Sequence, residues 1–173
     1  RLQAWTGLSE YQRDRIKVFL NPDSDPMGAG WNKRQSEIAV GSGGLWGKGF
    51  RRGTQNLLGF LPKTMAPTDF IFSVITEELG FAGSALVLGA FAVLLFGGVQ
   101  SALSGNDRFG RLMCVGVVAL LFSHVVVNVS MTIGLMPVTG LPLPLVSYGG
   151  SFMVTILAAL GMVQSVYIRR AVI

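Results

Sequence analysis

The sequence has few of the residues that form disulfides and bind metals. It contains one cysteine, Cys114, and one histidine, His124, in 173 residues. A disulfide within the chain is therefore excluded, and no cluster of histidines, cysteines and carboxylates predicts a tightly held structural metal. Both residues stand in apolar runs. We expect Cys114 to fill space in a membrane helix and His124 to be a buried histidine with satisfied hydrogen bonds.

Charge is also absent from long stretches. Asp, Glu, Lys and Arg are missing from the 57 residues that run from Leu112 to Ile168, and from the 28 residues that separate Glu78 from Asp107. A helix that crosses the hydrocarbon core of a bilayer needs about 20 apolar residues. We therefore predict an all-α integral membrane protein in which a large polar segment, residues 1–68, precedes three membrane helices. The predicted spans are about 69–103, 112–133 and 151–168.

Residues 134–150 are rich in proline and glycine and interrupt the longer uncharged run. Pro137, Pro142 and Pro144 exclude a continuous helix, because proline lacks a backbone donor and clashes with the preceding turn. Irregular backbone at membrane depth is tolerated only where it is buried in protein or lines a water-filled cavity. We therefore expect this segment to form part of a site.

Basic residues beside the short loops predict the orientation of the helices. They are Arg108, Arg111, Arg169 and Arg170. Because short cytoplasmic loops are enriched in Lys and Arg, both arginine pairs and the C-terminus are expected on the cytoplasmic side. The polar segment and residues 134–150 then lie on the outer side.

Residues 1–69 hold ten Lys or Arg against six Asp or Glu, which favours an anionic partner at the membrane surface.

The polar segment contains an amphipathic stretch between Leu2 and Phe19 and a glycine-rich loop at 41–49. The loop lacks the spacing of a nucleotide-binding P-loop, which would need glycine at Ser42 and a serine or threonine after Lys48. Two interpretations stay open. The glycines could let backbone N–H groups and basic side chains contact a phosphate, or the loop is an ordinary solvated one.

The first span begins with a polar stripe. Pro67 and Thr68 mark a predicted helix start, with Thr68 as the N-cap. On one continuous helix, Asp69 would share a face with Ser73, Thr76, Glu77 and Gly80. A polar stripe entering a membrane helix usually faces a cavity or another helix. The alternative is that Asp69 merely complements the helix dipole.

A set of short motifs runs through most of the chain. They are Tyr-Gln-Arg-Asp-Arg-Ile at 11–16, Asp-Pro-Met-Gly-Ala-Gly at 25–30, Gln-Ser at 35–36, Ile-Ala-Val-Gly-Ser-Gly-Gly at 38–44, Gly-Lys-Gly at 47–49, Gly-Thr-Gln at 53–55, Phe-Leu-Pro at 60–62, Thr-Asp-Phe-Ile-Phe at 68–72, Glu-Glu-Leu-Gly at 77–80 and Pro-Leu-Pro-Leu-Val-Ser-Tyr-Gly-Gly-Ser at 142–151. Together and in this order they resemble the SEDS family, the shape, elongation, division and sporulation proteins of bacterial cell-wall synthesis. The Gly-Lys-Gly and Gly-Thr-Gln variants are more similar to the elongation members, of the RodA type, than to the division members.

The resemblance implies that the chain is the C-terminal part of a ten-span protein of the bacterial inner membrane. It implies a peptidoglycan glycosyltransferase that polymerises lipid II beside a class B penicillin-binding protein, and no nucleic acid partner is expected. It also implies that Asp69, the acid of the Thr-Asp-Phe-Ile-Phe motif, is required for polymerisation. We assign to Asp69 the role of general base.

Further residues are expected to bind the lipid-linked substrate. Basic groups would stabilise the leaving pyrophosphate, together with a divalent cation (Mg²⁺ or Mn²⁺) that arrives with it and is not tightly bound by protein. Hydroxyl and amide groups would hydrogen-bond sugar or phosphate, or shape the cavity. The candidates are Gln12, Arg15, Lys48, Arg52, Thr54, Gln55, Ser147 and Ser151. No metal ligand is assigned.

Two other functions fit part of the same pattern. Broken helices and polar residues within the membrane also mark transporters, so a flippase for the same lipid is an alternative. A flippase would make no glycan from lipid II. A non-catalytic cell-wall scaffold is the other alternative, and it predicts that Asp69→Asn keeps full function.

Overall fold

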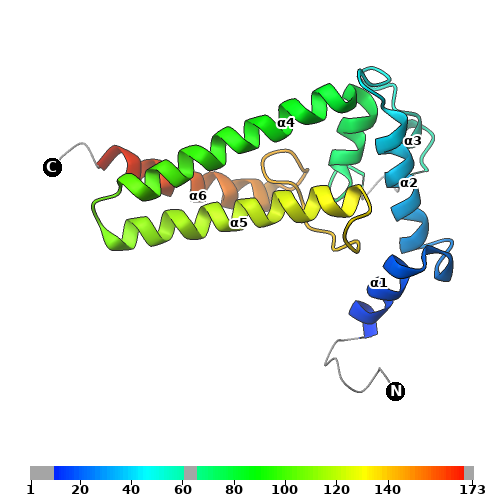
Figure 1. Cartoon of the computed structure of the whole chain (residues 1–173), viewed down its shortest axis with the longest axis horizontal. Coiled ribbons are helices and arrows are strands. Elements are labelled where there is room, and N and C mark those ends of the chain that lie inside the picture. The colour runs from blue at the N-terminus through cyan, green and yellow to red at the C-terminus, as the bar shows by residue number, and fades with distance from the viewer. Residues whose placement is uncertain (1–9, 61–65, 170–173) are drawn as a thin grey trace.

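A computed structural model describes residues 10–60 and 66–169, and leaves residues 1–9, 61–65 and 170–173 undescribed. All regular secondary structure in the described part is helical (Figure 1). The elements are α1 (Glu10–Leu20), the short 3-10 helix η2 (Pro22–Ser24), α2 (Ala29–Ser42), α3 (Thr54–Leu57), α4 (Ile71–Ser104), α5 (Arg108–Thr132) and α6 (Gly150–Arg169). The first half of the predicted amphipathic stretch lies outside the described residues, and its second half forms α1.

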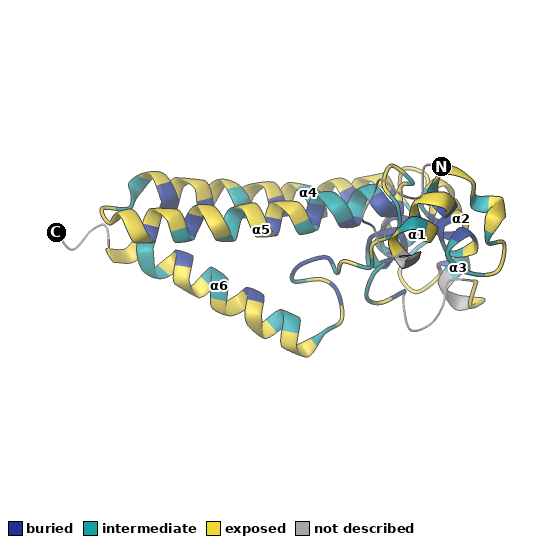
Figure 2. Ribbon diagram, turned by 90° about the horizontal axis from the view of Figure 1, so that it is seen from below, coloured by how far each residue is buried: buried dark blue, intermediate teal, exposed yellow. Residues whose placement is uncertain are grey.

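Three helices are long and apolar enough to cross a membrane: α4 with 34 residues, α5 with 25 and α6 with 20. They confirm the prediction of an all-helical protein with three spans. α4 and α5 lie side by side, whereas α6 diverges from them toward its N-terminal end (Figure 2). Large apolar side chains such as Phe96, Leu112 and Leu157 are exposed along these helices, as expected for surfaces that face lipid or further membrane helices.

The N-terminal helices gather at one end of the long helices (Figure 1). α2 packs there against the start of α4. The hydroxyls of Ser36 and Ser73 lie 2.6 Å apart, and Ser36 donates to the carbonyl of Thr132 at 2.8 Å. Ala39 packs beside them in a small apolar cluster with Phe70. A buried serine pair links α2 to both α4 and α5, so this end of the molecule is held together by polar as well as apolar contacts.

α4 is broken at Gly80, whose φ of 68° and ψ of −167° lie outside the helical region. Only glycine adopts this conformation readily. An unbroken helix would bond the N–H groups of Phe81 and Ala82 to the carbonyls of Glu77 and Glu78. The break takes all four groups out of the helix, which is costly at membrane depth without other partners. The predicted continuation of the polar face through Gly80 on one unbroken helix is therefore wrong.

The glycine-rich loop supplies the missing partners. The N–H groups of Lys48 and Gly49 donate to the two freed carbonyls at 3.0 and 2.9 Å, and the carbonyls of Gly44 and Leu45 accept from the two freed N–H groups at 2.9 and 3.1 Å. A side chain at the break would lie 2.3 Å from the nitrogen of Gly47. The loop glycines thus permit backbone to pack against backbone, a structural role that the sequence analysis did not predict.

The proline-rich segment has no helix or strand between Ile133 and Gly149. It folds back over the ends of α4 and α5 that carry the N-terminal helices. Leu143 is fully buried in an apolar cluster with Phe72 and Val125. His124 on α5 forms a hydrogen bond between its Nδ1 and the carbonyl of Pro142 at 3.2 Å, as predicted for a satisfied histidine, but it is half-buried and the predicted full burial is wrong.

Candidate functional site

Asp69 lies in a turn just before α4, at the end of the long helices where the N-terminal helices gather. The helix begins at Ile71, with Phe70 at the N-cap and no side-chain cap bond, so the predicted start at Thr68 is wrong. The turn forms instead because residues 66–70 are tied to the proline-rich segment: the N–H of Tyr148 donates to the carbonyl of Pro67 at 2.9 Å. Asp69 therefore stands outside the helix.

The surroundings of Asp69 set the pKa of its carboxyl group. Partial burial raises the pKa of Asp69 above its ordinary value, because removal from water penalises the charged form. A hydrogen bond from the Thr68 side chain and the positive charge of Arg15 act in the opposite direction without cancelling the rise in pKa. A carboxyl with a raised pKa is a stronger base when ionised.

Arg15 and the proline-rich segment close around the same carboxyl. The guanidinium of Arg15, from α1, donates to the carbonyl of Val138. Two residues further on, Gly140 has a φ of 75°, and a Cβ there would lie 3.2 Å from Oδ2 of Asp69. Glycine at 140 thus lets the backbone pass close to the carboxylate. Three segments that are far apart in the sequence meet at this point.

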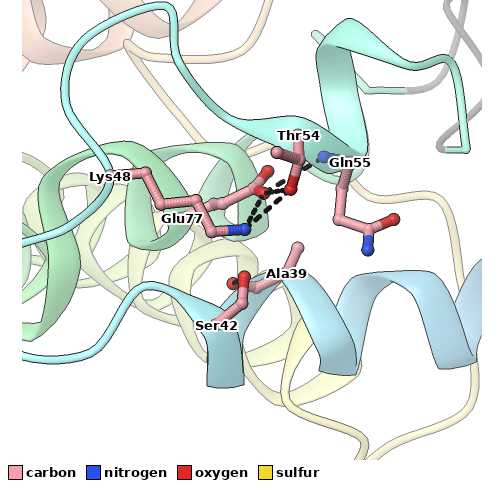
Figure 3. A network of polar contacts seen from close by, with 6 residues as sticks. All are labelled: Ala39, Ser42, Lys48, Thr54, Gln55 and Glu77. Atoms are coloured by element: carbon pink, nitrogen blue, oxygen red, sulfur yellow. Dashed lines mark hydrogen bonds and ion pairs between the residues drawn. The ribbon is translucent and has the colours of Figure 1, made fainter.

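A second polar cluster forms around Glu77, three residues before the break in α4 (Figure 3). Its side chain is 0% exposed, and Lys48, 27% exposed, makes an ion pair with Oε1 at 2.7 Å. Oε1 also accepts from the Thr54 hydroxyl at 3.0 Å and from the Gln55 backbone N–H at 3.1 Å. Lys48 donates to Thr54 as well, at 2.8 Å. Among the described residues, Oε2 of Glu77 has no hydrogen-bond partner.

The predicted substrate-binding residues therefore fall into separate groups. Lys48, Thr54 and the backbone of Gln55 interact with Glu77, whereas Arg15 lies close enough to Asp69 to act on its charge. Ser147 is 2% exposed, and its hydroxyl is hydrogen-bonded to two backbone groups, the N–H of Leu143 and the carbonyl of Thr68. The remaining three are Gln12 on α1, Arg52 before α3 and Ser151 in the first turn of α6, all exposed.

Two residues near Asp69 were missed by the sequence analysis. Asn128, a buried amide within α5, donates to the carbonyl of Asp69 at 2.9 Å. Gly140 lies against the carboxylate itself. The signal for Asn128 was present, since an amide in an otherwise apolar span indicates a specific partner. Within the described residues, no group of three or more His, Cys, Asp or Glu lies close enough together to hold a metal ion.

Known proteins resemble this chain over nearly its whole length. Residues 3–171 match the model of the family that includes FtsW, RodA and SpoVE and is described as cell cycle protein. The peptidoglycan glycosyltransferase MrdB of Escherichia coli is 47% identical over 163 residues, which cover 94% of this chain and 44% of that protein. The peptidoglycan glycosyltransferase RodA of Treponema pallidum is 44% identical, over 94% of this chain and 37% of that protein.

The fold has a solved counterpart. A chain from a structure on the coordination of polymerization and crosslinking by a peptidoglycan synthase complex aligns with a TM-score of 0.75 at 36% identity, over 98% of this chain and 45% of that chain. This sequence thus spans less than half the length of the relatives that it matches. The match of residues 3–171 to the family model includes the whole described structure, and the chain belongs to the FtsW/RodA/SpoVE family of cell cycle proteins.

Proposed function

We propose that the full-length protein is a peptidoglycan glycosyltransferase that polymerises lipid II during cell elongation, with Asp69 as the general base. The observation that carries the proposal is the partly buried Asp69 carboxyl with its raised pKa, flanked by Arg15. The names of the relatives MrdB and RodA support the reaction class. The resemblance of the chain to elongation members supports the role in elongation.

The chemistry needs one strong base. The hydroxyl of an acceptor sugar attacks the anomeric carbon of a lipid-linked donor. The new C–O bond forms as the bond to the pyrophosphate oxygen breaks, and the hydroxyl proton passes to the carboxylate of Asp69. Pyrophosphate leaves as an anion and needs no protonation, so the second carboxylic acid of ordinary glycosidases is unnecessary.

The leaving charge needs positive groups. Arg15 lies close enough to Asp69 to shift its pKa, so it is the best-placed cation for the leaving pyrophosphate. Arg52 is exposed in the segment before α3, and Gln12 lies one turn before Arg15 on α1. We propose that a Mg²⁺ or Mn²⁺ arrives with the pyrophosphate and helps to neutralise its charge. Lys48 is already paired with Glu77.

The proposed location is the bacterial inner membrane, with residues 1–68 and the Asp69 site on the outer side and the C-terminus in the cytoplasm. The length of α5 supports this location, since a helix of 25 residues is about 37 Å long and can cross the hydrocarbon core of a bilayer. The proposed partners are lipid II and a class B penicillin-binding protein. The solved relative from a peptidoglycan synthase complex supports a partner of this kind.

Cysteine labelling tests the orientation. In a full-length background without other cysteines, Leu135→Cys should react with a membrane-impermeant maleimide added to spheroplasts, and Asn106→Cys should react only after the membrane is opened. Both native residues are exposed, and they lie beyond opposite ends of α5. These positions avoid Gly140, where a side chain would meet Asp69. Labelling of both cysteines from the same side would overturn the topology.

The pH dependence of the reaction tests the environment of Asp69. The base acts in its ionised form, so polymerisation should fall as pH drops through the pKa of Asp69. Arg15 lowers that pKa, so Arg15→Gln should raise it and move the acid limb of the rate–pH profile to higher pH. Arg15→Lys retains the charge and should leave the limb nearly in place. An acid limb that is unmoved in Arg15→Gln, with lipid II binding intact, would contradict the assignment of Asp69.

The reaction class is tested with purified full-length protein in detergent and lipid II as the sole substrate. Formation of glycan strands, resolved by gel electrophoresis, is the expected result. A flippase would move the lipid across a bilayer and make no polymer. Absence of polymer from a well-folded preparation supplied with its transpeptidase partner and Mg²⁺ or Mn²⁺ would reject the proposed function.

A further inference from the structure

Asn128 links the turn that carries Asp69 to the proline-rich segment. Its side chain is 0% exposed, in the last two turns of α5. The Nδ2 amide group donates to the backbone carbonyl of Asp69 at 2.9 Å and to the carbonyl of Leu141 at 2.7 Å. Both amide hydrogens are therefore used, one by the turn that carries Asp69 and one by the proline-rich segment. A buried N–H donor is costly when it has no acceptor, so the two bonds favour the observed positions of the two carbonyls that accept them.

Ser147 holds the same turn one residue earlier. Its hydroxyl accepts from the N–H of Leu143 at 2.7 Å and donates to the carbonyl of Thr68 at 2.6 Å. With the bond from the Tyr148 N–H to Pro67, three consecutive carbonyls of the turn, those of residues 67, 68 and 69, accept hydrogen bonds from donors outside it. The backbone of residues 67–69 is thus held by a hydrogen bond at each residue, while Asp69 itself stays partly exposed to solvent.

We propose that Asn128 and Ser147 are positioning residues for the carboxylate of Asp69. The two side chains fix the backbone from which the carboxylate projects, at a set distance from Arg15 and Gly140. The proposal rests on the proposed function, in which this carboxylate takes the proton of the attacking hydroxyl. It assigns to Ser147 a role through Asp69 in place of the predicted contact with substrate.

The expected importance follows from the geometry of proton transfer. A general base must lie within about 2.6–3.2 Å of the proton donor in the reacting complex. Displacement of a catalytic group by about 1 Å can cost about 100-fold in rate. A turn with only local bonds can move by that amount, because short loops open at low free energy. Three hydrogen bonds from α5 and the proline-rich segment prevent it.

The test compares two positioning variants with two controls in full-length protein. Asn128→Leu keeps the size and removes both amide bonds, and Ser147→Ala removes the hydroxyl. Val125→Ala perturbs the packing of α5 one turn away, and Ser123→Ala removes an exposed hydroxyl that bonds only to the carbonyl of Ala119 in its own helix.

The steady-state rates on lipid II should separate the two pairs. We expect each positioning variant to lower kcat by about 10–100-fold. We expect KM to change by less than about threefold, because an interaction realised mainly in the transition state affects kcat and leaves substrate binding nearly unchanged. Both controls should keep kcat within about twofold of the parent, as surface and mild packing changes usually do. A normal kcat in Asn128→Leu and Ser147→Ala would overturn the proposal.

A second comparison uses the variant Asp69→Asn as background. If Asn128 and Ser147 act through the carboxylate, their substitution should lower the residual rate of Asp69→Asn little or not at all, because groups that act as a unit are not additive. A general folding defect would instead multiply with the loss of the base. Full additivity of the two losses would therefore reject the positioning role.

Amide hydrogen exchange followed by mass spectrometry tests the proposal without any reaction. Residues 66–70 should exchange several-fold faster in both positioning variants than in the controls, since each variant loses a bond that holds the turn. Unchanged exchange in both variants would reject the proposal whatever their activity. Normal polymerisation by Asp69→Asn would instead reject Asp69 as the general base of the proposed function. Hydrogen exchange would then still test whether Asn128 and Ser147 hold the turn.

Discussion

Asp69→Asn is expected to lower the polymerisation rate of the full-length protein by about 100-fold or more, the usual scale for loss of a general base. The amide has nearly the shape of the carboxylate but cannot accept the proton of the attacking hydroxyl at neutral pH. The carbonyl of residue 69 keeps its bond from Asn128, so the turn should stay folded. Glycan synthesis from lipid II by purified protein, at saturating substrate, is the measurement.

Asp14→Asn is the matched control for Asp69→Asn. Asp14 is an exposed acid on α1 whose ion pair with Lys17 joins two exposed side chains. Such a pair contributes about 0–1 kcal/mol to stability, and the substitution should leave the rate nearly unchanged. Near-normal glycan synthesis by a well-folded Asp69→Asn variant would remove Asp69 from the mechanism and favour the scaffold alternative.

Lys48→Met is expected to destabilise the protein more than it changes substrate use. It leaves Glu77, which is 0% exposed, with hydrogen bonds from Thr54 and Gln55 but without a countercharge. Removal of one partner from a buried ion pair costs about 3–5 kcal/mol, and the partial exposure of Lys48 places the effect near the lower end. The melting temperature of the purified protein should fall by several degrees, while the apparent affinity of the folded fraction for lipid II should change little.

The double variant Lys48→Met with Glu77→Gln separates the two roles of Lys48. Removal of both charges should recover part of the lost stability, because no unpaired charge remains buried. Lys17→Met is the matched control, because it removes a lysine from an ion pair between exposed side chains, and it should leave the melting temperature almost unchanged. A Lys48→Met variant that melts normally but binds lipid II weakly would restore direct contact between Lys48 and the pyrophosphate.

Much of the architecture could be predicted from local sequence. A charge buried in hydrocarbon is costly, so uncharged runs of 57 and 28 residues were enough to predict three helical spans. The prolines at 137, 142 and 144 excluded a helix between the last two spans, because proline acts on its own backbone and its immediate neighbours. The Thr-Asp-Phe-Ile-Phe motif singled out Asp69 as the candidate base.

The start of the first span and the phase of its polar face could not be predicted in the same way. The helix begins at Ile71 and breaks at Gly80, since backbone donors and acceptors of the glycine-rich loop replace the helical hydrogen bonds there. A glycine in a helical pattern is compatible with both a continuous and a broken helix. Only the loop that packs against it decides between the two.

By itself, the sequence determined the class of the protein and the number of apolar spans, and a motif of the family that it resembles nominated Asp69, because each depends on residues that are neighbours in the chain. The tertiary structure decided which polar groups meet. Lys48 and Glu77 are 29 residues apart, Asn128 and Asp69 are 59 apart, and Ser147 and Thr68 are 79 apart. No local pattern specifies such pairs. They form because buried polar groups must find partners, and the packing of the helices determines which partners are within reach.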